Sequence, residues 1–334
     1  MRVLAAADKF KGTATAEQVC AAIGHACWSL NIDCTEMPLA DGGEGTLAVL
    51  GGANRTSTVT GPLGTAVEAR WRMHRGTAVI EMAQASGLTL AGGPERNDPL
   101  NATTRGTGEL IDQALNAGAK KIIVCLGGSA TTDGGLGALR AISTPARLLA
   151  VDFLVACDVD TLFVDAARVF APQKGATRAH VNLLTGRLEK LAQTYKNTYG
   201  CDVATLAGSG AAGGLAGALA ALGATLVPGF DIVADEVGFY DAVREHDVVI
   251  TGEGLLDDTS FEGKVVGNVC DLTIDAGKKL AAIVGDIDEN MVHPLPPTLE
   301  TYSLTDLFGT ESAHQTVLRC IEEAALAYLQ KLKK

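Results

Sequence analysis

Short apolar runs recur along the chain, and each is followed by a turn that carries an acidic residue. Such runs are typical of strands in a parallel sheet whose two faces are covered by helices. The clearest runs are Arg2–Ala7, Ile122–Leu126, Phe153–Cys157, Val248–Ile250 and Ala281–Val284. Helical patterns separate them, and the alternation predicts an α/β chain. Because 334 residues exceed what one hydrophobic core usually organises, we expect two domains.

A different pattern occupies the region between residues 56 and 82. Three short strands are predicted there, separated by glycine turns: Thr56–Thr60, Ala66–Met73 and Ala78–Met82. This pattern indicates an antiparallel meander. Breakers follow from Gly92 to Pro99, and beyond them helices and strands alternate. We therefore predict one α/β domain with a mixed sheet in residues 1–92 with 286–334, and a second α/β domain with a parallel sheet in residues 93–285.

Composition and spacing exclude several classes of function. A net charge of −12 without basic and aromatic clusters argues against nucleic acid as a partner. The uncharged stretch Gly208–Val227 consists of small residues, which favours a packed internal helix over a membrane span. Eight cysteines without a C-x-x-C pair, and no secretory segment after Met1, favour a reduced, cytoplasmic chain. The six histidines show no zinc-ligand spacing.

Four carboxylates follow predicted strands, namely Asp8, Asp133, Asp158 and Glu253. In parallel α/β sheets, ligands bind outside the carboxyl ends of the strands. A single Asp after a strand is more often a helix cap, but four together form a pattern. Phosphoryl transfer needs carboxylates to orient the hydroxyl and hold Mg²⁺, with cations and backbone N–H groups around the phosphates.

Three glycine-rich turns are candidates for binding an anion. Gly127–Gly135 leaves a strand and enters a helix, and Asp41–Thr46 combines three glycines with two acids. Gly208–Gly213 matches G-x-G-x-x-G, but the strand before it is weak. Lys11 and Lys264 stand beside glycine rather than in charge runs, as Lys174 does. Ordinary turns and solvated lysines are the alternatives.

Together these segments resemble the glycerate kinase family of the bacterial type over essentially the whole chain from Ala7 to Gly285. The matching blocks follow in the family's order: Asp8–Gly12, Ala40–Thr46, Thr60–Gly64, Ile80–Ala83, Ala85–Leu88, Gly106–Leu110, Gly127–Gly135, Ala156–Val159, Pro172–Ala176, Gly208–Gly214, Thr251–Gly254, Asp257 and Gly263-Lys264. The chain departs from the pattern at Lys9 and Thr259, and in shorter segments at 143–152 and 160–167. Nucleotide preference or substrate size is open to change there.

The resemblance implies an enzyme that converts ATP and D-glycerate to ADP and 2-phosphoglycerate with Mg²⁺. It also implies two α/β domains, one with a mixed sheet and one flavodoxin-like with a parallel sheet, and an active site in the cleft between them. Only small molecules, glycerate and ATP, are expected as partners, without nucleic acid or membrane. We expect a monomer or homodimer in the cytoplasm.

The acids and turns, together with the resemblance, suggest a role for each residue. The predicted catalytic residues are Asp133, which would orient or deprotonate the acceptor hydroxyl, and Lys174, which would lie at the phosphates. Asp158 and Glu253 would hold Mg²⁺. The predicted nucleotide and phosphate contacts are Gly127, Gly128, Ser129, Thr131, Gly208, Ser209, Gly210 and Lys264. The predicted acceptor site consists of Asp8, Lys11, Asp41, Gly42, Gly43, Glu44 and Arg105, the last as a fork for the carboxylate of glycerate.

Three other functions stay open from the sequence. The nearest is a glycerate kinase that forms 3-phosphoglycerate, because the sequence does not distinguish two adjacent hydroxyls. A nicotinamide-dependent oxidoreductase acting on a small hydroxy acid would use the Gly208–Gly213 turn. A non-catalytic anion-binding regulator is the third possibility, but both of these last two leave the four carboxylates unexplained.

Overall fold

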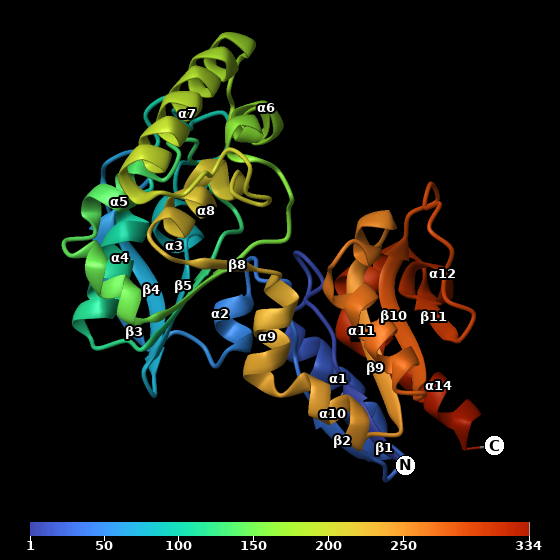
Figure 1. The fold of residues 1–334 in the computed structure, drawn as a ribbon. Coiled ribbons are helices and arrows are strands. Elements are labelled where there is room, and N and C mark those ends of the chain that lie inside the picture. Colours follow the sequence, from blue (N-terminus) through green and yellow to red (C-terminus); the bar gives the residue numbers. More distant parts are fainter. Residues whose placement is uncertain (334) are drawn as a thin grey trace. The chain divides into compact units, whose positions relative to one another are not determined.

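The computed structural model describes residues 1–333, and the chain divides into two compact units. The parallel-sheet unit comprises Met1–Asp41 and the chain from Phe230 onward, drawn in blue and in orange to red in Figure 1. The mixed-sheet unit comprises Gly42–Gly229. One unit holds a parallel sheet of five strands and the other a mixed sheet of six. The expectation of an α/β chain with one mixed and one parallel sheet is confirmed.

The parallel sheet is assembled from both ends of the chain. Its strands are β1 (Arg2–Ala5), β2 (Asp33–Glu36), β9 (Val248–Leu256), β10 (Lys279–Ile287) and β11 (Leu299–Ser303). They lie in the order β11-β10-β9-β1-β2, and all neighbouring pairs are parallel. Counted in chain order within the unit, this is the arrangement 2-1-3-4-5 of flavodoxin-like sheets. Val3 lies between Cys34 and Val248 in the register.

Helices cover both faces of the parallel sheet, and its central strands accordingly carry continuous apolar runs at Val3–Ala5, Val248–Ile250 and Leu280–Val284. One face packs with α1 (Ala16–Ser29) and α14 (Val317–Leu332), which also contact each other, and α11 (Val265–Asp275) packs on β9 and β10. Thr15 and Gln18 form a capping box at the start of α1, a signal that these neighbouring residues carry in the sequence. The unit's remaining helices are α9 (Gly229–Val237), α10 (Phe239–Glu245), η4 (Asp258–Phe261), α12 (Leu304–Phe308) and α13 (Thr310–Gln315).

The mixed sheet contains the predicted meander. Its strands, in spatial order, are β3 (Arg55–Thr60), β4 (Ala66–His74), β5 (Thr77–Glu81), β6 (Lys121–Cys125), β7 (Asp152–Ala156) and β8 (Thr225–Val227). The β3–β4 and β4–β5 pairs are antiparallel, and the pairs from β5 to β8 are parallel. The meander is confirmed, and the carboxyl ends of β5, β6 and β7 meet at one edge.

The helices of the mixed-sheet unit pack around one apolar cluster. They are α2 (Thr46–Val49), α3 (Ala83–Ser86), α4 (Arg105–Asn116), α5 (Leu136–Ala141), η1 (Pro145–Ala150), η2 (Phe163–Asp165), α6 (Ala166–Phe170), η3 (Pro172–Lys174), α7 (Arg178–Tyr199) and α8 (Ala211–Ala221). The uncharged stretch from Gly208 is largely buried in this cluster as α8. Within residues 1–333, no helix has both the length and the apolar character to cross a membrane.

The structure divides the chain differently from the predicted boundaries at 92 and 286. Strand β1, predicted in the same domain as the meander, lies in the parallel sheet. Strands β9 and β10, predicted in the domain of the middle segment, lie in that same sheet, with β9 beside β1 and β10 beside β9. The reason is the pairing of Val3 with Val248, which joins strands that are remote in the sequence. Apolar periodicity identifies a buried strand but carries no information about which strand it pairs with.

Candidate active site

In the parallel-sheet unit, two acidic residues lie at the carboxyl edge, where the strand order reverses between β1 and β9. Asp8 follows β1, and its backbone N–H donates to the carbonyl of Gly252 at 2.9 Å. Glu253 is the next residue of β9. The point where strand order reverses is where open α/β sheets form a ligand crevice. Two residues predicted from different parts of the chain therefore lie at this point.

The electrostatics of this pair show a shortage of positive charge. Asp8 is 9% exposed, and burial raises its pKa to about 6, with Lys9 opposing the shift and Asp41 adding to it. Burial raises the pKa of Glu253 to about 7, while the Ser260 hydroxyl and the charge of Lys264 act in the opposite direction. Oε1 of Glu253 is buried without a hydrogen-bond partner among residues 1–333. A cation at this edge would stabilise both carboxylates.

The segment after β9 continues the same site. Asp257 accepts hydrogen bonds from the Thr259 hydroxyl (2.6 Å) and from the backbone of Ser260 (3.1 Å), which caps η4. Lys264 stands at the start of α11, and its ammonium donates to the Thr259 hydroxyl. Lys11 is exposed, and its backbone passes Gly254, where a β-carbon would lie 3.3 Å from the Lys11 nitrogen. The predicted residues Asp8, Glu253, Lys11 and Lys264 thus belong to one unit.

In the mixed-sheet unit, two of the three predicted glycine turns, at 42–46 and 127–129, touch each other. A β-carbon on Gly127 would lie 3.0 Å from the Cα of Gly43 and 3.1 Å from the nitrogen of Glu44. Glu81, the last residue of β5, accepts hydrogen bonds from the backbone of Gly45 (3.0 Å) and Leu47 (2.8 Å). The contact brings the 42–46 turn beside the 127–129 turn at the carboxyl edge of the sheet.

Lys174 is buried against the 127–129 turn. Its side chain is 2% exposed and donates to the Ser129 hydroxyl and the Thr131 carbonyl, both at 2.7 Å. Burial lowers its pKa to about 7, against the opposing effect of the Asp133 carboxylate. Asn97 donates to the carbonyls of Lys174 (2.9 Å) and Ala130 (3.0 Å). These contacts hold the turn from within the unit.

Asp133, predicted as the base, is enclosed by donors. Its Oδ2 accepts from the backbone (2.9 Å) and hydroxyl (2.9 Å) of Thr104 and from the backbone of Gly137 (3.2 Å), and its Oδ1 accepts from Gly135 (3.0 Å). Burial raises its pKa, although each of these donors opposes the rise. The carboxylate joins α4 to the turn that precedes α5. This geometry is that of a residue holding a loop.

Asp158, predicted as a metal ligand, follows β7 in the mixed-sheet unit. Its Oδ1 accepts a hydrogen bond of 2.6 Å from the backbone of Gly229. A β-carbon on Gly42 would lie 2.5 Å from the Cα of Gly229 and 2.8 Å from the Cβ of Ala156, so Gly42 is closely packed there. Asp158 and Glu253 belong to different units, and their pairing around one ion stays a prediction.

The Gly208–Gly210 turn is buried in the mixed-sheet unit. The Ser209 hydroxyl bonds with the carbonyls of Val203 (2.7 Å) and Leu206 (2.6 Å) and with the backbone nitrogen of Phe163 (2.9 Å). No strand leads directly into the turn in residues 1–333, because helices up to α7 lie between it and β7. The turn therefore lacks the strand on which a dinucleotide-binding fingerprint depends.

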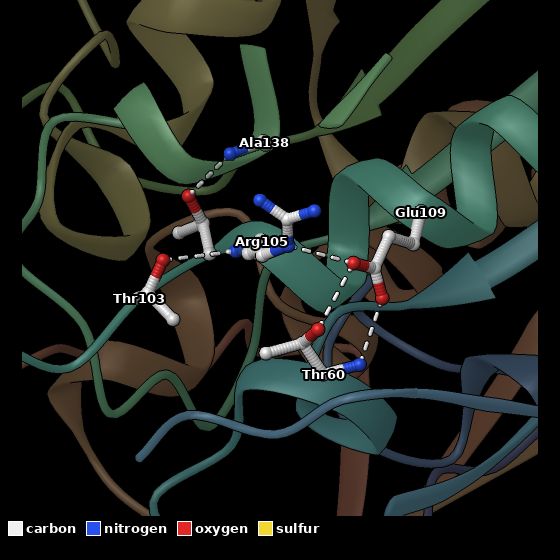
Figure 2. Close-up of polar contacts among 6 residues, drawn as sticks. Thr60, Thr103, Arg105, Glu109 and Ala138 are labelled. Carbon is white, nitrogen blue, oxygen red and sulfur yellow. Dashed lines mark hydrogen bonds and ion pairs between the residues drawn. The ribbon is translucent and has the colours of Figure 1, made fainter. Parts of the chain in front are cut away.

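Arg105 begins α4 and is paired with Glu109 (Figure 2). Its Nε donates to Glu109 at 2.9 Å, and Glu109 also accepts from the backbone and hydroxyl of Thr60. The side chain of Arg105 is 55% exposed. In Figure 2 its two terminal nitrogens point away from Glu109. This leaves part of the guanidinium fork available for an anion.

Two residues outside the predicted site, Glu81 and Thr104, contact residues that were predicted to belong to it. Glu81 holds the 42–46 turn, and Thr104 supplies two of the four donors to Asp133. Glu81 lies in the sequence block Ile80–Ala83 that follows the family pattern, and an acid ending an otherwise apolar strand is the signal that marks it. Thr104 carries no comparable signal.

Comparisons with known proteins find similarity to glycerate kinases along nearly the whole chain. The model of the glycerate kinase family matches residues 3–146 and 142–332. The glycerate 2-kinase of Escherichia coli K12 is 38% identical over 335 residues, covering 88% of each chain. The glycerate kinase of Halalkalibacterium halodurans is 38% identical over 327 residues, covering 86% of each. A crystal structure described as glycerate kinase 2 of Salmonella typhimurium LT2 aligns with a TM-score of 0.86 at 34% identity, covering 100% of this chain and 98% of that one.

Proposed function

The chain belongs to the glycerate kinase family, and on that premise we propose that it transfers the γ-phosphoryl group of ATP to the 2-hydroxyl of D-glycerate, releasing ADP and 2-phosphoglycerate. The observation that carries the proposal is the family match over residues 3–146 and 142–332. The similar protein of Escherichia coli is named glycerate 2-kinase, which supports the 2-hydroxyl as the acceptor.

Phosphoryl transfer depends on positioning and electrostatics, and a bound Mg²⁺ neutralises charge that develops on the phosphates. Mg²⁺ is usually held by one or two carboxylates and leaves its other positions to water and phosphate oxygens. Glu253 fits this role, because its buried Oε1 has no hydrogen-bond partner among residues 1–333. No group of three or more ligating side chains forms a metal cage in the described chain, so the ion would be shared with the nucleotide. Asp158 stays the proposed second ligand.

For the acceptor hydroxyl we favour Asp8 over Asp133. The oxygens of Asp133 already accept four hydrogen bonds inside the mixed-sheet unit. The side chain of Asp8 has a hydrogen bond and an ion pair with Lys9, at 2.7 and 3.6 Å, at the point where the strand order reverses. Asp8 would orient the hydroxyl and accept its proton, with Asp41 and Lys11 beside it.

Charge on the transferred group would be stabilised by fixed donors. Lys264, at the start of α11, is a candidate for the nucleotide phosphates, as the resemblance implies. The Gly127–Ser129 turn would supply backbone N–H groups, and Lys174 would act from behind by holding Ser129. Arg105, whose terminal nitrogens point away from Glu109, would bind the carboxylate of glycerate.

The test is a coupled assay of ADP release with MgATP and D-glycerate, compared with L-glycerate and hydroxypyruvate. We expect turnover with D-glycerate, and NMR of the product should show phosphate on the 2-oxygen. Phosphate on the 3-oxygen would retain the reaction class and overturn the regiochemistry. Absence of ADP release with D-glycerate would overturn the proposed function.

A further inference from the structure

The segment Glu81–Leu88 runs from the last residue of β5 through α3 and has no role in the proposed chemistry. It nevertheless contacts two of the three glycine turns of the mixed-sheet unit. One end holds the Gly42–Thr46 turn, and the other end holds the Gly127–Ala130 turn. The contacts at the two ends differ in kind, one being a side chain and the other the backbone.

At the first end, the contact is the carboxylate of Glu81. The side chain is 6% exposed, and Oε1 accepts from the backbone nitrogens of Gly45 (3.0 Å) and Leu47 (2.8 Å). Burial raises the pKa of Glu81, and these two N–H groups oppose the rise. No cation is paired with this carboxylate among residues 1–333, and its hydrogen-bond partners are neutral donors. One oxygen atom thus fixes the backbone at both Gly45 and Leu47.

At the other end, the backbone makes the contacts. Leu88 donates to the carbonyl of Gly128 (2.8 Å), Ala130 donates to the carbonyl of Ser86 (3.0 Å), and Gly87 forms a bridge with Ser129. The Ser86 hydroxyl bonds with the Thr107 hydroxyl at 2.9 Å, which ties the segment to α4. This end is therefore a rigid base.

The two turns also support each other. A β-carbon on Gly127 would lie 3.0 Å from the Cα of Gly43, so the backbones are already in contact. A shift of the 42–46 turn would change that contact. Glu81 is the side chain through which the rigid base reaches this turn.

From this arrangement we propose that Glu81 is a positioning residue, which sets the acceptor turn Gly42–Thr46 against the phosphate turn Gly127–Ser129 without touching substrate. The effect on catalysis rests on the proposed function. A misplacement of about 1 Å in a reacting group lowers rates by about 100-fold. Because the two bonds need an acceptor oxygen rather than a charge, an amide oxygen replaces the carboxylate oxygen adequately.

The test compares Glu81→Ala with Glu81→Gln, and uses Glu68→Ala, an exposed position on β4, as the control. We expect Glu81→Ala to lower kcat/KM for glycerate by about 30- to 100-fold. Glu81→Gln should stay within about fivefold of the wild type, and Glu68→Ala within about twofold. If Gln fails as badly as Ala, the charge itself is required, and a purely positioning role is overturned. If Ala leaves kcat/KM within twofold, the proposal also fails.

Amide hydrogen exchange provides a readout independent of activity. Glu81→Ala should accelerate exchange at Gly45 and Leu47 by at least tenfold, while Leu88, bonded to Gly128, keeps its rate. Unchanged exchange at Gly45 and Leu47 would overturn the proposal even where the wild type is active. Conversely, a wild type that does not phosphorylate glycerate refutes the proposed function, and the exchange rates still decide whether Glu81 holds the turn. Should the Ala variant not fold, Glu81→Asp, shorter by one methylene, should exchange faster than Gln at both amides.

Discussion

Each unit holds a pair of carboxylates on or after its strands, Glu81 and Asp133 in one and Asp8 and Glu253 in the other, and the pairs differ in what surrounds their oxygens. In the mixed-sheet unit, Asp133 accepts four hydrogen bonds and Glu81 accepts two from backbone nitrogens. In the parallel-sheet unit, Glu253 has an oxygen with no partner among residues 1–333, and Asp8 has contacts with Lys9. Burial raises the pKa of all four carboxyl groups.

The difference separates acids that hold the fold from acids that are available to a ligand. Several donors inside the protein offset part of the desolvation of Asp133 and Glu81, so these acids serve the folded state itself. For Glu253 the Ser260 hydroxyl and the charge of Lys264 offset part of the desolvation, but its buried Oε1 has no partner among residues 1–333, and such an oxygen destabilises the fold. Such a cost is typical of functional sites, where the missing partner arrives with the ligand or metal. The parallel-sheet edge is therefore where we expect substitutions to affect chemistry most.

The largest effect is expected at Glu253. Glu253→Gln removes the charge proposed for Mg²⁺ and should lower kcat by about 1000-fold or more at saturating MgATP. The same variant should gain stability at pH 8. The folded pKa of about 7 lies above the ordinary value of 4.5, so the wild type loses stability as pH rises from 4.5 to 7, by up to about 3 kcal/mol. Urea unfolding at pH 8 measures this difference.

The control for Glu253 is Glu262→Gln, which lies nearby in the sequence and is exposed. It removes the same charge from the unit and should leave kcat unchanged. A Glu253→Gln enzyme with more than a tenth of wild-type turnover would place the metal ligand elsewhere. Lower stability in that variant at pH 8 would show that Oε1 has a partner that favours its charge.

At Asp133 we expect a loss of stability as the main effect, with a smaller direct effect on turnover. Asp133→Asn directs an amide NH₂ group toward backbone donors and should lower the free energy of unfolding by about 2–4 kcal/mol. Activity should fall with the fraction of folded protein and by about tenfold beyond it, because the turn before α5 loosens. Urea unfolding and turnover measured on the same sample separate the two. A loss of turnover by orders of magnitude at wild-type stability would return the role of base to Asp133.

The buried amine of Lys174 should give a dependence of stability on pH. Its pKa falls from 10.5 to about 7 on folding, so between these values the unfolded chain binds more protons than the folded one. Wild-type stability should therefore rise with pH relative to Lys174→Met, by at most about 1.4 kcal/mol per pH unit. Urea unfolding at pH 7, 8 and 9 tests this, with the exposed Lys196→Met as the control. Parallel curves for wild type and Lys174→Met would show that Lys174 is charged in the fold.

Local pattern predicted much of this architecture, because strands and turns depend on neighbouring residues. The meander and the capping box at Thr15 are both local features, and both are present. Sheet membership was not predictable, because β1 pairs with β9, about 245 residues away. The role of Glu81 was not predictable for the same reason, because its partners Gly45 and Leu47 lie 36 and 34 residues earlier.

For the site, the sequence located acids but not their surroundings. Asp133 and Glu253 have the same pattern, an acid just beyond or at the end of an apolar run. They differ only in donors, such as Thr104, that come from elsewhere in the fold. Counting strand-end acids therefore finds candidates, and the hydrogen-bond partners of each carboxylate decide which candidates are free to act.

The smallest effect is expected at Arg105, which lies in the mixed-sheet unit. Its Nε is bonded to Glu109, but its two terminal nitrogens point away from that residue (Figure 2). Arg105→Ala should raise KM for glycerate by about tenfold and leave KM for ATP unchanged, because one charged contact to a carboxylate is lost. Its pair with Glu109 is exposed, so stability should change by less than about 1 kcal/mol. Arg105→Lys should recover little, since an ammonium does not reproduce the fork. Arg187→Ala, which removes the same charge from the same unit, should leave both KM values unchanged. An unaltered KM for glycerate in Arg105→Ala would mean that the guanidinium serves only Glu109. In that case the charged groups of the mixed-sheet unit named above would serve the fold, and those available to a ligand would lie in the parallel-sheet unit.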